Sequence, residues 1–156
     1  HLARVSDQMR RKPFLWDNYP VNDGPRMSQH LHLRAFTGRP GAIAEHISGH
    51  AVNPASQAVL SRIPALTLAE SYAKGADYQY GAAFRRAADA VLGSALADAV
   101  ERTLLLIEDT GLKGLDEDRK TRLRARFAAF DHPAAREIVA WLDGAFDLGA
   151  EELQTQ

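Results

Sequence analysis

The chain has 156 residues, enough for one ordinary domain or for parts of two. Hydrophobic residues make up 46% and charged residues 25%, which is typical of a globular protein, and the absence of cysteine excludes disulfides and thiolate metal sites. With a formal net charge of −1 and no apolar run near the roughly 20 residues that span a bilayer, we expect neither nucleic acid nor a membrane as partner, while the compartment stays open.

The first region, residues 1 to about 63, mixes short apolar runs with proline and glycine. Apolar residues at helical spacing over residues 2–9 predict a helix, which Pro13 ends because proline disfavours helical geometry in the residue before it. Residues 14–16 then predict a short buried strand, within a strand region of about 13–18.

A loop, a short helix and a second strand are expected next. Residues 19–25 hold too many turn formers for regular structure, whereas residues 42–47 suit a short helix and residues 49–53 a strand closed by Pro54. This order predicts a parallel sheet. Because two strands cannot make a stable parallel sheet, we expect residues 1–63 to complete a larger sheet and the chain to belong to a longer polypeptide. The alternative is a complete small domain behind a tag remnant.

From about residue 64 the chain is rich in alanine and leucine, and apolar residues recur at helical spacing. Ser94 and Asp116 are expected N-caps, glycines at 93 and 111 end two of the helices, and Pro133 opens the last one. This region therefore predicts an antiparallel helical bundle over residues 64–156. The residues expected to face inward are Leu66, Ala69, Ala73, Phe84, Ala87, Ala88, Val91, Leu96, Val100, Leu104, Ile107, Leu123, Phe127, Phe130, Ile138, Trp141, Leu142 and Phe146.

Polar and aromatic side chains gather where the two predicted strands end. Side chains alternate across a strand, so Trp16 and Asn18 share one face and Asp17 lies on the other. Asp23 follows in the loop, and Asn53 ends the second strand. An aromatic ring, amides and a carboxylate are what a sugar pocket needs. The alternative is that Trp16 belongs to the core and the polar residues only form turns.

The string Leu-Trp-Asp-Asn-Tyr-Pro-Val-Asn-Asp at residues 15–23 closely resembles the motif at the seventh barrel strand of glycoside hydrolase family 84, the β-N-acetylglucosaminidases that include O-GlcNAcases and enzymes once labelled hyaluronidases. Leu-His-Leu at 31–33, Gly-Arg at 38–39 and Gly-His-Ala-Val-Asn-Pro at 49–54 continue the similarity. The similarity is strong over residues 12–70. The chain departs from the family's usual pattern at Arg34-Ala35, Ala55 and Lys74-Gly75-Ala76.

The resemblance implies a mostly α fold, in which residues 1–63 are the last strands of an incomplete (β/α)8 barrel and residues 64–156 a post-catalytic helical bundle domain. It also implies that Trp16 walls the pocket around an N-acetyl group, while Asn18, Asp23 and Asn53 hydrogen-bond the sugar. Asp17 takes no such role, and Tyr19 and Asn22 support the pocket from behind.

For activity, the resemblance implies a retaining β-N-acetylglucosaminidase in which the substrate's own acetamido group attacks the anomeric carbon and forms an oxazoline. The family's two catalytic aspartates are adjacent, and no Asp-Asp pair occurs here. We therefore expect no catalytic residue in this chain, an aspartate pair upstream, and no activity from the chain alone. The expected partners are a GlcNAc-containing glycan or glycoprotein and the upstream half of the catalytic domain, with no cofactor. A helical protein-interaction module and a non-catalytic sugar-binding relative are the alternatives.

Two other patterns in the sequence resemble binding sites. His30 and His32 have strand-like spacing, and His46 and His50 have helix-like spacing, but no carboxylate stands at a matching third position, so surface or supporting histidines are expected and no metal. The basic run over residues 119–126 is spread around a helix and predicts a solvated face.

Overall fold

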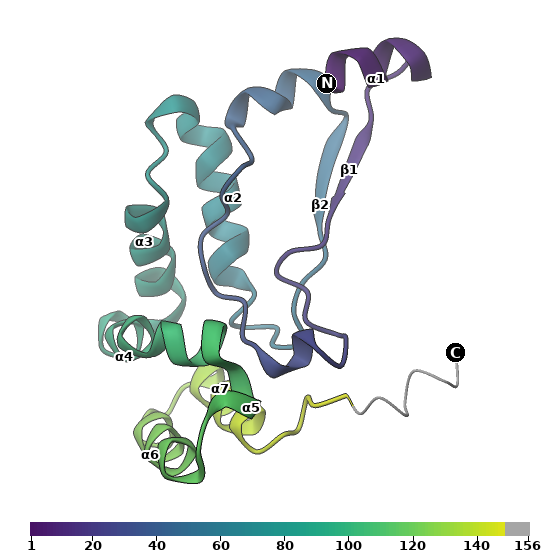
Figure 1. Ribbon diagram of the computed structural model, residues 1–156. Helices are drawn as coiled ribbons and strands as arrows, with labels where there is room; N and C mark the ends of the chain where they lie inside the picture. Colours follow the sequence, from purple (N-terminus) through teal and green to yellow (C-terminus); the bar gives the residue numbers. More distant parts are fainter. Residues whose placement is uncertain (149–156) are drawn as a thin grey trace.

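A computed structural model describes residues 1–148, which form a mostly helical chain with one small sheet (Figure 1). Residues 149–156 of the predicted bundle lie outside this range. The elements in chain order are α1 (Leu2–Met9), β1 (Phe14–Asp17), the 3₁₀ helices η1 (Met27–Gln29) and η2 (Gly41–His46), β2 (Gly49–Val52), α2 (Arg62–Lys74), the 3₁₀ helix η3 (Gly75–Asp77), α3 (Tyr80–Leu92), α4 (Ser94–Leu104), the π-helix η4 (Leu105–Thr110), α5 (Gly111–Gly114), α6 (Glu117–Ala128) and α7 (Pro133–Leu142).

The sheet consists of β1 and β2, which pair in parallel from Phe14 opposite Gly49 to Asp17 opposite Val52. This confirms the predicted parallel strand pair. The ring of Phe14 lies over Gly49 so closely that a Cβ there would come within 2.7 Å of it. The expectation of a buried first strand is wrong, because Phe14 and Trp16 are 62% and 65% exposed on their common face.

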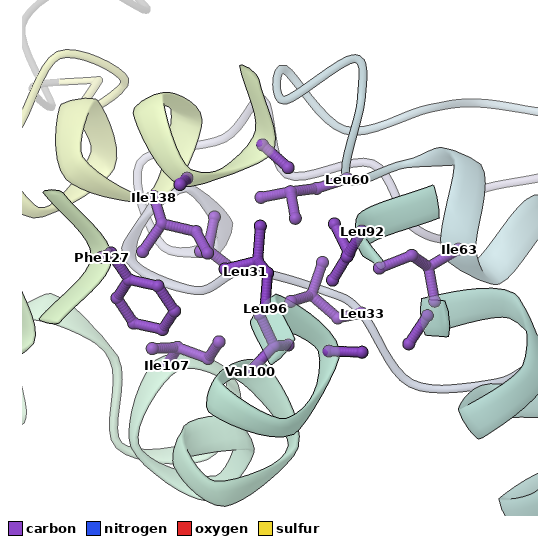
Figure 2. Packing of buried hydrophobic residues seen from close by; sticks show 14 of the residues in the cluster. Leu31, Leu33, Leu60, Ile63, Leu92, Leu96, Val100, Ile107, Phe127 and Ile138 are labelled. Carbon is purple, nitrogen blue, oxygen red and sulfur yellow. The ribbon is translucent and has the colours of Figure 1, made fainter. Parts of the chain in front are cut away.

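One hydrophobic core joins the helices to the segments that follow the two strands (Figure 2). Leu31 and Leu33 lie between η1 and η2 in the chain, and they are buried against side chains of α3, α4 and α7. Leu60, just before α2, is also fully buried in this cluster. Trp141 is buried in α7, as expected, and its indole N–H donates to the carbonyl of Ser28 at 3.0 Å. The helices therefore hold the long segment after β1 in place.

Helix α2 packs through a face that the apolar pattern does not predict. Leu66, Ala69 and Ala73 were expected inside, but all three are exposed. Thr67 and Ser71 are buried instead, beside apolar neighbours of the same helix. Their hydroxyls are satisfied locally, since each donates to a backbone carbonyl of the preceding turn at 2.7 and 2.8 Å. A buried polar residue with such a partner costs little, so this face can be the inner one.

The helix ends agree with the sequence in part. Asp116 caps α6 as predicted, accepting a hydrogen bond from the backbone N–H of Arg119 at 2.7 Å. Ser94 is not a cap, because it is already the first residue of α4 and Gly93, with φ of 74°, holds the cap position. The single helix expected up to Gly111 is interrupted by the π-helix η4.

The basic run lies on the exposed surface of α6, as expected. Arg119, Lys120 and Arg124 form ion pairs with Asp116, Glu117 and Asp143. Surface pairs of this kind contribute little to stability. Within residues 1–148, no helix combines the length and apolar character that crossing a bilayer requires.

Candidate functional site

Three of the predicted site residues meet at the ends of the two strands. Asn18 and Asn53 each directly follow the last paired residues of β1 and β2, and the backbone N–H of Asn53 continues the ladder by donating to the carbonyl of Asp17 at 2.9 Å. The side-chain amide of Asn53 donates to Asn18 Oδ1 at 3.4 Å, and the indole N–H of Trp16 donates to the same oxygen at 3.0 Å. One indole and two amides thus form a single hydrogen-bonded group.

The Trp16 side chain is available to a ligand. It is 65% exposed and therefore does not belong to the hydrophobic core of the described residues. A groove of about 410 Å³ runs beside β1 and is lined by Leu15, Trp16, Asp17, Asn18, Tyr19 and Arg39. An exposed indole beside hydrogen-bonding amides can pack on an apolar patch of a sugar while the amides bind its hydroxyls.

The loop residues are placed differently from the strand ends. Asp23 is exposed, and its side chain makes no hydrogen bond to another residue of the described range. Asn22, in contrast, is 1% exposed, and it donates to the side chain of Gln57 at 2.8 Å and accepts from the backbone N–H of Ser56 at 2.9 Å. It therefore ties the loop after β1 to the segment after β2.

Tyr19 also anchors this loop. Its hydroxyl donates to the carbonyl of Arg34 at 2.7 Å, and its ring stacks on His32 and meets Phe36 edge to face. Burial raises the pKa of the Tyr19 hydroxyl, so this group stays protonated and acts as a donor. Tyr19 and Asn22 thus shape the loop from behind.

A charged network surrounds the buried Asp17 carboxylate on the other side of β1. The Asp17 carboxylate receives two hydrogen bonds from Arg39, from Nε at 2.6 Å and from Nη2 at 3.2 Å. His50 Nε2 lies 3.3 Å from the same carboxylate, and His50 Nδ1 lies 2.6 Å from the hydroxyl of Tyr72 in α2. Asp17 points toward α2, away from Trp16 and Asn18, as strand alternation predicts.

The histidines are not arranged as a metal site. No group of three or more His, Cys, Asp or Glu side chains suited to a metal occurs in the described part of the chain. His46 and His50 do not share a helix, because η2 ends at His46 and β2 begins at Gly49. Of the two expected roles, surface or supporting, His50 has the supporting one, since its side chain is only 5% exposed and contacts the Asp17 carboxylate.

A second cavity was not foreseen from the sequence. It measures about 520 Å³ and lies between the segment at residues 34–37 and helices α3 and α4. Glu108, carried by the π-helix, lines it, and burial raises the pKa of this carboxyl to about 7. No sequence signal marks Glu108, because its environment comes from residues about 75 positions away. The other lining residues include Tyr19, Phe36, Tyr80, Phe84 and Leu104.

Comparison with known proteins agrees with this picture. Residues 1–105 match the family described as beta-N-acetylglucosaminidase. Among solved structures, the chain is similar to a mutant O-GlcNAc hydrolase of Thermobaculum terrenum, with a TM-score of 0.74 and 24% identity over 92% of this chain. It is also similar to CpGH84B, with a TM-score of 0.58 and 19% identity over 94% of this chain.

These structural similarities concern the fold, because both identities are low. The chain spans 37% of the length of the first structure and 31% of the second. The family match, in contrast, covers most of this chain, including both strands and every predicted site residue. The family predicted from the motif at residues 15–23 is thereby confirmed. The chain belongs to the β-N-acetylglucosaminidases of glycoside hydrolase family 84.

Proposed function

We propose that this chain supplies the sugar-binding strand ends of a retaining β-N-acetylglucosaminidase that removes terminal β-linked GlcNAc, as an O-GlcNAcase does. The observation that carries this proposal is the hydrogen-bonded group of Trp16, Asn18 and Asn53 at the ends of two parallel strands. Ligands of β/α barrels bind at this end of the strands. Membership of the family makes a GlcNAc-containing substrate the expected ligand.

Each residue then has a distinct task. Trp16 packs on the N-acetyl group, and Asn18 hydrogen-bonds within the same pocket. Asp23 and Asn53 bind hydroxyls at the far end of the pyranose ring. Because Asp23 is exposed and free of other hydrogen bonds among residues 1–148, its carboxylate can accept two bonds from a sugar. Buried hydrogen bonds of this kind discriminate strongly between sugars.

In this proposal β1 and β2 are the last two strands of a (β/α)8 barrel. Residues 1–63 then complete the catalytic barrel, and residues 64–156 form the helical bundle domain after it. The exposed faces of Phe14 and Trp16 support this arrangement, since aromatic side chains on a strand are normally covered or used for binding. The upstream half of the same domain is the partner that would cover Phe14, while the sugar would cover Trp16.

The chemistry is substrate-assisted. The acetamido oxygen attacks the anomeric carbon, the leaving oxygen takes a proton, and the resulting oxazoline is opened by water with net retention. Two adjacent aspartates outside this chain would orient the acetamido group and transfer the protons, and the residues of this chain would hold the sugar. The chain alone would then be inactive.

Kinetics on the full-length protein test this proposal. We expect hydrolysis of an aryl β-GlcNAc glycoside but not of the corresponding β-glucoside, because the glucoside lacks the attacking acetamido group. Asp23→Ala should sharply lower kcat/KM on the first substrate and weaken binding of GlcNAc analogues, whereas Asp77→Ala, an exposed aspartate in η3, should leave both unchanged. Equal turnover of both glycosides would refute substrate assistance. Unchanged binding in Asp23→Ala would favour the helical interaction module.

A further inference from the structure

We propose that Asp17, Arg39 and His50 form a positioning network that fixes the strand ends carrying Asn18 and Asn53, and so sets affinity for the sugar through these two residues. This inference rests on the proposed function. It gives a role to Asp17, which the sugar-binding motif contains but whose carboxylate is engaged by Arg39 and His50.

The buried carboxylate of Asp17 is both paired with a cation and hydrogen-bonded. The Asp17 side chain is 7% exposed, and a buried carboxylate is costly unless it is paired and hydrogen-bonded. Arg39 meets it with Nε and Nη2, which is the two-pronged geometry that fixes direction as well as charge. His50 Nε2 supplies a third contact at 3.3 Å. The carboxylate consequently has little freedom to move.

His50 connects this carboxylate to the helix behind the sheet. If the Tyr72 hydroxyl donates to Nδ1 and the ring donates its Nε2–H to Asp17, a neutral His50 is satisfied at both nitrogens. The chain of contacts then runs from α2 through β2 to β1. Arg39 adds the segment before η2, where its carbonyl lies 3.5 Å from the Ser71 hydroxyl of α2. Three other parts of the fold, α2, β2 and the segment before η2, are thus connected to one residue of β1.

Asp17 lies in the chain between Trp16 of β1 and Asn18 just after it, the two side chains that would hold the sugar. Its backbone carbonyl also accepts the N–H of Asn53, so a shift of Asp17 moves both strand ends. The contact between Asn53 Nδ2 and Asn18 Oδ1 measures 3.4 Å, close to the longest distance at which such a bond persists. Displacements well below 1 Å would therefore break the group.

A merely stabilising role would not require charge here. Well-packed apolar residues of similar volume are often as stable as a buried ion pair, or more so. A bidentate pair instead imposes direction, and misplacement of binding groups by about 1 Å can cost about 100-fold in activity. The network is therefore suited to position the residues in front of it.

The test is a double-mutant cycle in the full-length protein. Binding of GlcNAc-thiazoline, the sulfur analogue of the oxazoline intermediate, is measured by calorimetry together with kcat, KM and the melting temperature. Asp17→Asn should weaken binding by about tenfold or more. Tyr72→Phe keeps the ring of the α2 partner and removes only its hydroxyl, so a smaller loss is expected. Glu70→Gln, which removes the two ion pairs of Glu70 with Lys74 and Arg86 outside the network, should not change affinity.

The cycle pairs Asp17→Asn with Asn18→Ala. If Asp17 acts through Asn18, adding Asp17→Asn to the Asn18→Ala protein should weaken binding much less than Asp17→Asn does in the parent protein. Fully additive losses, or an Asp17→Asn protein that melts earlier but binds normally, would overturn the network. Arg39→Lys provides a milder variant, because it keeps the charge and loses the two-pronged contact. If Asn18→Ala itself leaves binding unchanged, the proposed function fails, and the positioning role fails with it.

Discussion

The carboxylate of Glu137 in α7 accepts a hydrogen bond from the backbone N–H of Leu60 at 3.0 Å, although 77 positions of the chain separate them. It also accepts the N–H of Val59 at 2.9 Å. Glu108 does the same for two consecutive amides in the segment after β1, at 3.2 and 3.1 Å. Two carboxylates from the helices thus hold the backbone of the two segments that leave the sheet.

Removing Glu137 should cost the protein considerable stability. Glu137→Ala leaves two backbone amides without their acceptor, and we expect a loss of about 2–4 kcal/mol in the free energy of unfolding. Glu137→Gln retains one acceptor oxygen and should lose less. Urea unfolding of the variants measures both values. Glu117→Ala, at an exposed residue of α6, is the matched control and should change stability by less than about 0.5 kcal/mol. Equal losses in Glu137→Ala and Glu117→Ala would show that the contact contributes nothing.

The burial of Glu108 should make stability depend on pH. Burial disfavours the charged form and raises the pKa of the Glu108 carboxyl from its usual value of 4.5 to about 7. A raised carboxyl pKa means that the folded state holds the proton more tightly than the unfolded state. Glu108 therefore makes its full contribution to the free energy of unfolding below about pH 4.5. This contribution, at most about 3 kcal/mol, is lost as the pH rises through about 7.

Glu108→Gln removes this titration. Urea unfolding at pH 5 and pH 8 should show a smaller difference between the two pH values in this variant than in the parent protein. Glu101→Gln, which lies in the same cavity but is exposed, should keep the parent's pH dependence. If Glu108→Gln and its parent lose equal stability between pH 5 and pH 8, the carboxyl of Glu108 is not the titrating group.

Trp141 should contribute more to stability than its size alone predicts. Trp141→Phe removes both buried volume and the donor to the Ser28 carbonyl, so a loss of about 2–4 kcal/mol is expected. Trp16→Phe makes the same chemical change at an exposed site and should cost less than about 0.5 kcal/mol. Thermal unfolding monitored by circular dichroism compares the two. Similar melting temperatures for both variants would contradict the assigned core position.

Part of this molecule follows from the sequence through local rules. Strand alternation places the side chains of Asp17 and Asn18 on opposite faces. Because β1 and β2 are parallel, their C-terminal ends lie side by side, which brings Asn53 beside Asn18. The cap at Asp116 and the proline at the start of α7 follow equally from local chemistry. The nine-residue motif at residues 15–23 identifies the family, which the periodicity of apolar residues alone does not indicate.

The rest depends on contacts between distant residues. The buried partner of Asp17 is His50, 33 positions away, and spacing alone pairs His50 with His46 instead. The inner face of α2 carries Thr67 and Ser71, whose burial depends on backbone acceptors that hydrophobic patterning ignores. Such features become visible only once the chain packs.

A crystal structure of the full-length protein with GlcNAc-thiazoline is the most direct test of the central claim. We predict that the indole of Trp16 lies against the ring that derives from the N-acetyl group, and that Asn18, Asp23 and Asn53 come within about 2.7–3.2 Å of polar atoms of one sugar. A ligand bound away from the ends of β1 and β2, or bound there without contact to these side chains, would contradict it.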